Sequence, residues 1–87
     1  MRGQELLTLV VYDVKDDRIR LRIANVCKDY GLDHIQYSAF CGTLDSTRRA
    51  ALFTRLADTL GDAAGKLLVI PLCEKDVQAK RQVINAG

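Results

Sequence analysis

The amino-acid sequence predicts a small α+β fold, because strand-like and helix-like patterns alternate along it. Apolar runs rich in β-forming residues occupy residues 6–12 and 67–73, and apolar residues recur at helical spacing in residues 19–30 and 52–60. A strand-like segment lies between the two helical stretches. With 87 residues, 48% of them hydrophobic, the chain has the material for one small domain at 1–87 and not for two. Small domains often gain stability by self-association, so a homodimer is plausible.

The first apolar run, LLTLVVY at residues 6–12, predicts a central strand that ends near Asp13. The run is almost continuous, which is typical of a strand covered on both faces. It is too short for a signal peptide or a membrane span. We therefore expect a cytoplasmic protein with no membrane association.

A first helix is expected shortly after Asp13, where Asp16 or Asp17 can cap its N-terminus and Gly31 can end it. Its apolar positions recur at helical spacing. These positions are Ile19, Ile23, Val26, Cys27 and Tyr30. This is the clearest helical pattern in the chain.

Residues 33–44 predict two short strands or one bent strand. Ile35, Tyr37 and Ala39 share one strand face, whereas the bulky Phe40 falls on the other. A bulge or a change of strand near Ser38 and Ala39 is therefore needed to bury Phe40.

The second helix is expected to begin at Asp45 or Ser46, whose side chains can cap it, and to stop before Gly61. Its apolar stripe consists of Leu52, Phe53, Leu56, Ala57 and Leu60. The late apolar run then predicts a strand, with Pro71 at its end or on a sheet edge. The polar tail at residues 74–87 predicts a turn and a short C-terminal strand that could pair with a partner's sheet edge.

The order strand, helix, strand, strand, helix, strand is the ferredoxin-like βαββαβ arrangement, an antiparallel sheet with two helices on one face. That fold hosts many unrelated activities. The formal net charge of +2 does not by itself indicate nucleic-acid binding. Cys27, Cys41 and Cys73 are widely spaced within apolar patterns, which argues against disulfides and a zinc site. We expect reduced thiols in the core.

Asp13 is the first candidate for chemistry, because it stands where the first strand should end. Magnesium binds oxygen ligands, usually one or two carboxylates with water completing the shell. One aspartate per chain is a poor site, but a dimer axis that joined two copies of Asp13 would create a site for activating water against a phosphodiester. The alternative is that Asp13 satisfies a turn and that Asp16 and Asp17 are only helix caps.

Arg18, Arg20 and Arg22 lie in the first predicted helix, and Lys15 precedes it. At helical spacing Arg18 and Arg22 flank the apolar stripe on one side and Arg20 flanks it on the other, so they form no single stripe. Arginine side chains suit phosphate oxygens, so these cations are candidates for holding a nucleic-acid backbone near Asp13. They occupy a helix end where the dipole favours acidic residues, so helix stability does not explain them. The alternative is a solvated face paired with nearby aspartates.

Other positions give weaker indications. The second helix carries a similar but sparser set of arginines. They are Arg48, Arg49 and Arg55. His34 has no carboxylate or second ligand in a recognisable pattern, which is typical of a surface residue. The sequence contains no catalytic-serine context, Walker loop, dinucleotide fingerprint or Cys-x-x-Cys pair.

Three segments combine a strand-end Tyr-Asp pair, an arginine-bearing helix and a Gln-Tyr-Ser-x-Phe strand. They are residues 12–20, YDVKDDRIR, residues 31–42, GLDHIQYSAFCG, and residues 69–73, VIPLC. At these spacings the combination resembles the CRISPR-associated Cas-two family. The similarity runs through nearly the whole chain.

The resemblance implies a homodimer that joins the Cas-one integrase in spacer acquisition, a step of antiviral defence, and binds duplex DNA along a basic surface. It also implies a magnesium-dependent endonuclease acting on RNA or DNA, with Asp13 as catalytic residue and metal ligand. Tyr12, Arg20, Arg22 and Phe40 would support that site or its substrate. The chain departs from the family at His34, where the residue is often basic, and in its short tail.

The sequence leaves three functions open. The first is a metal-dependent nuclease in which paired Asp13 residues bind magnesium and the arginines position the backbone. The second is a non-catalytic adaptor that holds duplex DNA for the integrase. The third is a regulatory or toxin-type RNA-binding module, which the wide reuse of the fold allows.

Overall fold

The computed structural model of the chain describes residues 5–72. In that range, strands and helices alternate in the predicted order. Their bounds are Leu6–Val14 (β1), Asp17–Asp29 (α1), Asp33–Gln36 (β2), Ala39–Leu44 (β3), Ser46–Leu60 (α2) and Gly65–Leu72 (β4). The ferredoxin-like βαββαβ prediction is confirmed. The short C-terminal strand predicted for the tail lies outside the described residues.

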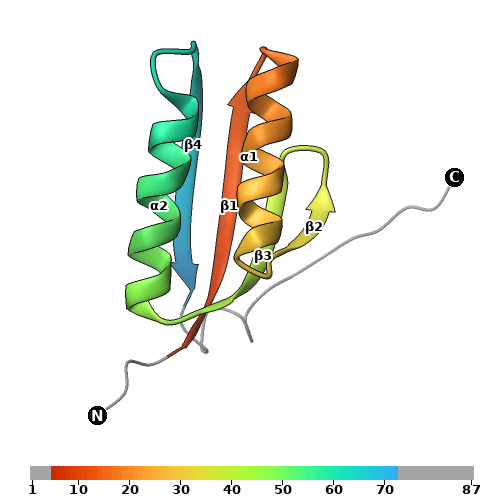
Figure 1. The fold of residues 1–87 in the computed structure, drawn as a ribbon. Helices are drawn as coiled ribbons and strands as arrows, with labels where there is room; N and C mark the ends of the chain where they lie inside the picture. Colours follow the sequence, from red (N-terminus) through yellow and green to blue (C-terminus); the bar gives the residue numbers. More distant parts are fainter. Residues whose placement is uncertain (1–4, 73–87) are drawn as a thin grey trace, which may run out of the picture.

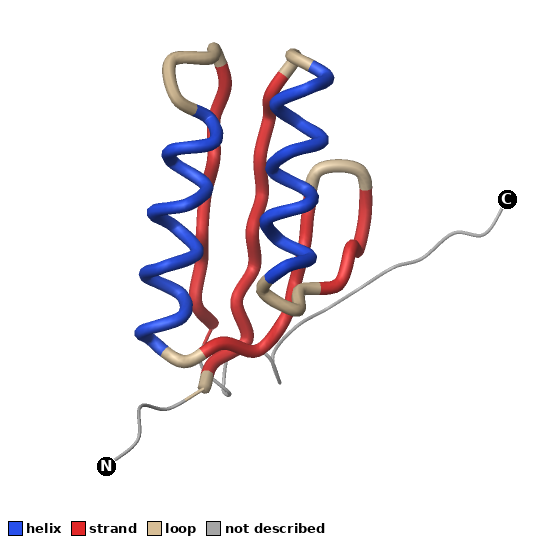
Figure 2. Tube along the Cα trace, in the orientation of Figure 1, coloured by secondary structure: helices blue, strands red, loops and turns tan. Residues whose placement is uncertain are grey.

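The strands form one antiparallel sheet in the order β2-β3-β1-β4. Both helices lie on the near side of this sheet in Figure 1, with α1 close to β1 and β3 and with α2 in front of β4. Figure 2 shows the same two-layer arrangement, in which the helices stand side by side. The sheet therefore has one face covered by helices and one face turned away from them.

The central strand β1 alternates between these two faces. Thr8, Val10, Tyr12 and Val14 are buried on the helix side. The residues between them are exposed or only half-buried. The expectation that β1 is covered on both faces is wrong for the described part of the chain, because its continuous apolar run reflects one covered face and one uncovered apolar face.

Helix α1 begins and ends as the sequence predicts. Asp16 is the N-cap residue, and its Oδ1 accepts hydrogen bonds from the backbone N–H groups of Arg18 at 2.9 Å and Ile19 at 3.1 Å. Asp17, the alternative cap, lies in the first turn instead. Gly31 follows the helix with a φ of 79°, a conformation that glycine adopts without steric cost.

The predicted strand pair after α1 is a hairpin of β2 and β3, joined by a turn at residues 37–38. The predicted change of strand near Ser38 and Ala39 is confirmed, because the chain turns at residues 37–38 and β3 begins at Ala39. A register shift between His34 and Gln36 in β2 accompanies it. The shift and the turn together return Phe40 to the helix side, where it is 1% exposed.

The core lies between the helices and the sheet. Its largest fully buried side chains are Phe40, Ile23, Leu52, Leu56, Val10, Thr8 and Cys27. The buried stripe of α2 is narrower than predicted, because Phe53 is 50% exposed and Ala57 is also exposed. Neither helix of the described range has the length and apolar character needed to cross a membrane.

Candidate functional site

Asp13 lies near the C-terminal end of β1, on the sheet face that the helices do not cover. Its neighbours Tyr12 and Val14 are buried on the helix side, so strand alternation directs Asp13 the other way. The side chain is exposed, and its carboxylate makes no hydrogen bond or ion pair within residues 5–72. Asp13 therefore does not satisfy a turn, and the alternative structural role is not supported.

The sheet face that carries Asp13 is apolar along β1 and β4, which pair directly. The apolar residues that face one another on it are Leu7, Leu9 and Val11 on β1 and Leu72, Ile70 and Leu68 on β4. We call these six residues the open face. Leu68 is 56% exposed and Ile70 is 36% exposed, so much of their apolar surface meets solvent. The pair Asp13 and Lys66 stands at one end of the open face.

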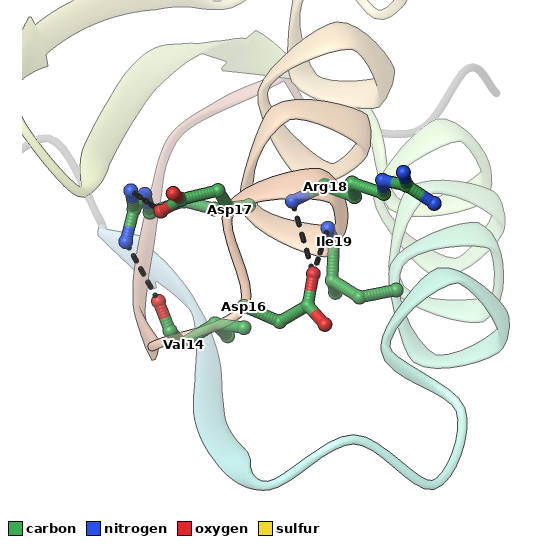
Figure 3. Close-up of polar contacts among 6 residues, drawn as sticks. Val14, Asp16, Asp17, Arg18 and Ile19 are labelled. Carbon is green, nitrogen blue, oxygen red and sulfur yellow. Dashed lines mark hydrogen bonds and ion pairs between the residues drawn. The ribbon is translucent and has the colours of Figure 1, made fainter.

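The arginines of α1 divide into two groups. Arg20 is partly engaged, because its Nη1 donates to the Val14 carbonyl at 3.2 Å and its Nη2 pairs with the Asp17 carboxylate. Arg18 and Arg22 are exposed. Figure 3 shows the Arg18 side chain extending away from Asp17, on the other side of the helix start. The three arginines therefore form no single cluster, as their spacing predicts.

Two solvent-accessible cations are neighbours of Asp13, one along the sequence and one across the sheet. Lys15 is exposed in the link between β1 and α1, and Lys66 lies opposite Asp13 on β4. Arg18 and Arg22 add exposed cations on α1, beside the exposed carboxylates of Asp16 and Asp17. Such an arrangement suits a phosphate backbone that passes near Asp13.

The arginines of α2 have structural partners. The guanidinium groups of Arg48 and Arg55 lie 5.5 Å and 5.6 Å from the centroid of the Tyr30 ring. Arg55 also pairs with Asp29 at 3.5 Å, and Arg49 donates to a backbone carbonyl at the end of β3. These contacts tie α2 to the end of α1 and to β3, which explains the weaker arginine pattern without a ligand.

Tyr12 and Phe40, which the family resemblance associates with the Asp13 site, lie on the other face of the sheet. Their rings and that of His34 form a row across β1, β3 and β2, with centroids 6.4 Å apart for Tyr12–Phe40 and 4.7 Å apart for His34–Phe40. The interplanar angles are 19° and 20°, so the rings are nearly parallel. The structure thus does not bring Tyr12 and Phe40 together with Asp13.

Burial shifts two titrating groups on the helix side. Burial raises the pKa of the Tyr12 phenol and the Cys27 thiol raises it further, while the Arg20 guanidinium opposes the rise. Burial also raises the pKa of Cys27 to about 11. Cys27 is therefore a protonated core thiol, as predicted, whereas Cys41 is half-buried and Cys73 lies outside the described residues.

The donor set for a magnesium ion at this site is more complete if a second chain contributes a carboxylate. Residues 5–72 contain no group of three or more histidine, cysteine, aspartate or glutamate side chains that could hold a metal. Each chain supplies one Asp13 carboxylate, which is exposed and has no partner among residues 5–72. One or two carboxylates, with water in the other positions, is a donor set that magnesium accepts. Two copies of Asp13 would supply that set.

Sequence reasoning missed two features of the molecule. The open face had a signal, because both strand parities of residues 67–72 are apolar, but that pattern predicts burial without showing what covers the second face. The second feature is the position of Tyr37, which is 95% exposed beside the ring row. The sequence gives no sign of it, because the turn and the register shift decide where Tyr37 projects.

The fold and the site define a class of protein: a small ferredoxin-like domain with two helices on one sheet face, an apolar opposite face, and an exposed aspartate at the end of that face. The family model described as CRISPR associated protein Cas2 matches residues 6–80. The chain belongs to the Cas2 family. The resemblance seen in the motifs is thereby confirmed.

Individual relatives agree with this assignment. A protein named CRISPR-associated endoribonuclease Cas2 from Desulforudis audaxviator is 42% identical over 81 residues, which cover 92% of this chain and 76% of the relative. A more distant relative, from Thermoproteus tenax, is named as a fusion of the endonucleases Cas1 and Cas2. It is 26% identical over 87 residues, which cover 94% of this chain and 33% of the fusion.

Solved structures share the fold. The crystal structure of a hypothetical protein, TT1823, from Thermus thermophilus has a TM-score of 0.78 and 28% identity, and covers 97% of this chain and 95% of that chain. The crystal structure of Cas2 from Streptococcus pyogenes has a TM-score of 0.73 and 26% identity, and covers 92% of this chain and 100% of that chain.

Proposed function

We propose that this chain acts in CRISPR spacer acquisition as a homodimer that binds nucleic acid and cleaves phosphodiester bonds with Mg²⁺. The observation that carries the proposal is the exposed carboxylate of Asp13 at the end of the open face, which makes no hydrogen bond or ion pair with any of residues 5–72. Membership of the Cas2 family supports the role in adaptation. The names of relatives as endoribonucleases support the cleavage activity.

The open face supports the homodimer in this proposal. A contiguous apolar patch on a small soluble domain marks an interaction surface. A second copy is the occupant that offers the same apolar residues in self-complementary form. A two-fold axis near the end that carries Asp13 and Lys66 would bring two Asp13 carboxylates toward one metal ion.

The chemistry of such a site divides between the ion and the chain. Bound Mg²⁺ would lower the pKa of a water molecule and neutralise charge on the phosphodiester. Asp13 from each copy would hold the ion by its carboxylate oxygens. Arg18, Arg22 and Lys15 are exposed and would hold the phosphate backbone by their N–H groups. Tyr12 lies on the helix side of the sheet, opposite Asp13, and would contribute only by packing β1 against the core.

The decisive experiment compares Asp13→Asn with the wild-type protein in the presence of Mg²⁺. Cleavage of single-stranded RNA and of duplex DNA should fall at least about a hundredfold, since Asn removes a charged metal ligand. Asp58→Asn, on the exposed side of α2, is the matched control and should cleave normally. Undiminished cleavage by rigorously purified Asp13→Asn would overturn the nuclease proposal.

A second candidate function is the non-catalytic adaptor that holds duplex DNA for the Cas1 integrase. The relative from Thermoproteus tenax favours it, because there the Cas2 sequence is part of one chain with Cas1. In this case Asp13→Asn should leave spacer uptake unchanged. The double variant Arg18→Glu, Arg22→Glu should abolish salt-sensitive duplex binding in both cases, because it replaces two phosphate-binding cations by anions.

We further propose that residues 1–87 act as a single domain in the cytoplasm, where invading DNA and the spacer array are found. Fractionation of cells that express a tagged chain tests the location. Recovery of the chain from the membrane or periplasmic fraction would contradict it.

A further inference from the structure

A groove opens on the helix side of the sheet, away from the open face and from Asp13. Its volume is about 290 Å³, and it runs between α1 and the hairpin of β2 and β3. Because the proposed dimer covers the opposite face, this groove would stay accessible in each copy. None of the roles considered above for Asp13 uses it.

One wall of the groove is built from rings. Tyr12, Phe40 and His34 form the near-parallel row across the sheet, and Tyr37 stands at the hairpin turn. Tyr12 and Phe40 are almost fully buried, whereas His34 is exposed and Tyr37 is 95% exposed. The Nε2 atom of His34 lies 3.3 Å from the Tyr37 carbonyl oxygen, which fixes the imidazole over Phe40. The outer end of the ring row therefore has no ring to cover it.

The other wall is one face of α1. Its lining residues there are Asp17, Arg20, Leu21, Ala24 and Lys28. Ala24 leaves room in the middle, and Leu21 is 61% exposed, so it offers apolar surface opposite the rings. Arg20 and Lys28 are eight residues apart, which is about 12 Å along the helix axis. A cation thus stands toward each end of an apolar and aromatic centre.

The polar groups at one end have a defined arrangement. Arg20 uses two N–H groups on Val14 and Asp17, and a guanidinium has five. The remaining N–H donors stand next to the acceptor oxygens of Asp17. A flat ligand whose edge carries both acceptors and donors would match this pair. The Asp17 charge disfavours a phosphate at that end and favours one beside Lys28.

From these features we infer that the groove binds one unstacked nucleotide of a single-stranded nucleic acid. The base lies against His34 and Tyr37, with its edge toward Arg20 and Asp17, and the adjoining phosphate contacts Lys28. Aromatic platforms flanked by cations are the usual means of holding single strands, because every base has a stacking face. A base paired inside a duplex cannot enter such a groove, so the site selects unpaired nucleotides.

This inference deepens the proposed nucleic-acid function and is independent of metal binding. It predicts a contact that works in EDTA and survives Asp13→Asn. Loss of cleavage without loss of this contact would therefore concern the proposed nuclease only. Loss of this contact with normal cleavage would concern the groove only.

The first test uses mononucleotides. GMP, AMP, CMP and UMP, each at millimolar concentration in EDTA, are titrated into the ¹⁵N-labelled full chain and followed by NMR. Amide shifts should concentrate on α1 and the hairpin, around Lys28 and Tyr37. Inorganic phosphate at equal concentration should not reproduce them. Shifts confined to the open face, or identical shifts with phosphate alone, would overturn the inference.

The second test uses short oligonucleotides with and without one abasic position. A single-stranded RNA hexamer should bind about tenfold more tightly than the same hexamer whose central base is removed, because stacking of one base is lost while the phosphates remain. Equal binding would contradict a base site. Binding of a DNA hexamer of the same sequence shows which polymer the groove accepts. Tighter binding of the RNA hexamer assigns the groove to RNA, and equal binding of the two hexamers assigns it to both polymers.

The variants separate ring stacking from other effects. Tyr37→Ala should weaken hexamer binding about tenfold, whereas Tyr37→Phe should retain it, because the ring and not the hydroxyl makes the contact. Ile35→Ala in β2 is the matched control. Tyr37 and Ile35 are both exposed, so folding of these variants is not at risk. A duplex should bind all of these variants equally. Equal loss in Tyr37→Phe, or equal loss for the duplex, would overturn the inference.

Discussion

The two faces of the sheet are built from similar residues but have different surroundings. On the helix side Val10 and Tyr12 are buried under α1 and α2, whereas on the other side Leu68 and Ile70 keep much of their surface exposed. Both sets of residues are apolar. An apolar strand position therefore indicates that the side chain is to be buried, but it does not indicate which element covers it. The helices of the same chain cover one face, and a second copy is proposed to cover the other.

The largest expected difference between the faces is in folding stability. Leu56→Ala on α2 removes a fully buried side chain and should lower the free energy of unfolding by about 3 kcal/mol at any protein concentration. Leu68→Ala should lower it only at concentrations where the dimer forms, because Leu68 meets solvent in the single chain. Urea unfolding at several concentrations measures both. If Leu68→Ala lowered the free energy of unfolding as much as Leu56→Ala at every protein concentration, the proposed difference between the two faces would be wrong.

The covered face should also make the protein sensitive to alkali. The Cys27 pKa is raised from 9.0 to about 11, so the unfolded chain loses this proton more readily than the folded chain. The resulting stabilisation is complete below pH 9 and should decline by about 2 kcal/mol as the pH rises to 11. Urea unfolding between pH 8 and 11 measures the decline.

Tyr12 shifts in the same direction, so a control must separate the two groups. Cys27→Ala is less stable at every pH, because it leaves a small cavity, but it should show a shallower decline above pH 9. Parallel curves for the variant and the wild type would show that the Cys27 thiol is not protected by its burial.

The open face is tested by a charge. Leu68→Glu should weaken self-association at least about tenfold, because the dimer would bury an unpaired carboxylate. Analytical ultracentrifugation gives the dissociation constant. Thr54→Glu, on the exposed side of α2, is the control and should dimerise normally. Unchanged association of Leu68→Glu would remove the open face as the dimer surface.

The smallest expected effect separates two neighbouring aspartates, Asp13 and Asp16. Asp16→Ala removes the N-cap of α1 and should cost about 1 kcal/mol of stability. Asp13→Ala should change stability by less than about 0.5 kcal/mol, because its carboxylate has no partner within the described chain. Thermal unfolding of the two variants side by side measures the difference. A larger loss in Asp13→Ala would give Asp13 a structural role and weaken its assignment to the metal.

Those parts of the site whose positions depend on short-range sequence patterns could be predicted. The α1 cap at Asp16, the strand-end place of Asp13 and the division of the arginines follow from spacing along one strand and one helix. The grouping of Tyr12 and Phe40 with Asp13 came from the family resemblance and not from spacing. Neighbours in a strand point to opposite faces, so Tyr12 adjoins Asp13 in sequence and lies across the sheet from it in space.

The amino-acid sequence by itself determined the order of the elements and the family, and it singled out Asp13 as the candidate metal ligand. Each of these depends on local spacing and residue type. Tertiary structure alone decided that β1 is covered on one face and that the hairpin shift places His34 over Phe40. It also decided that the Tyr37 side chain is exposed and lines the same groove as α1. The physical reason is that burial and ring contacts depend on the strand register and on which face of the sheet the helices cover. Both are determined by residues that are distant in the chain.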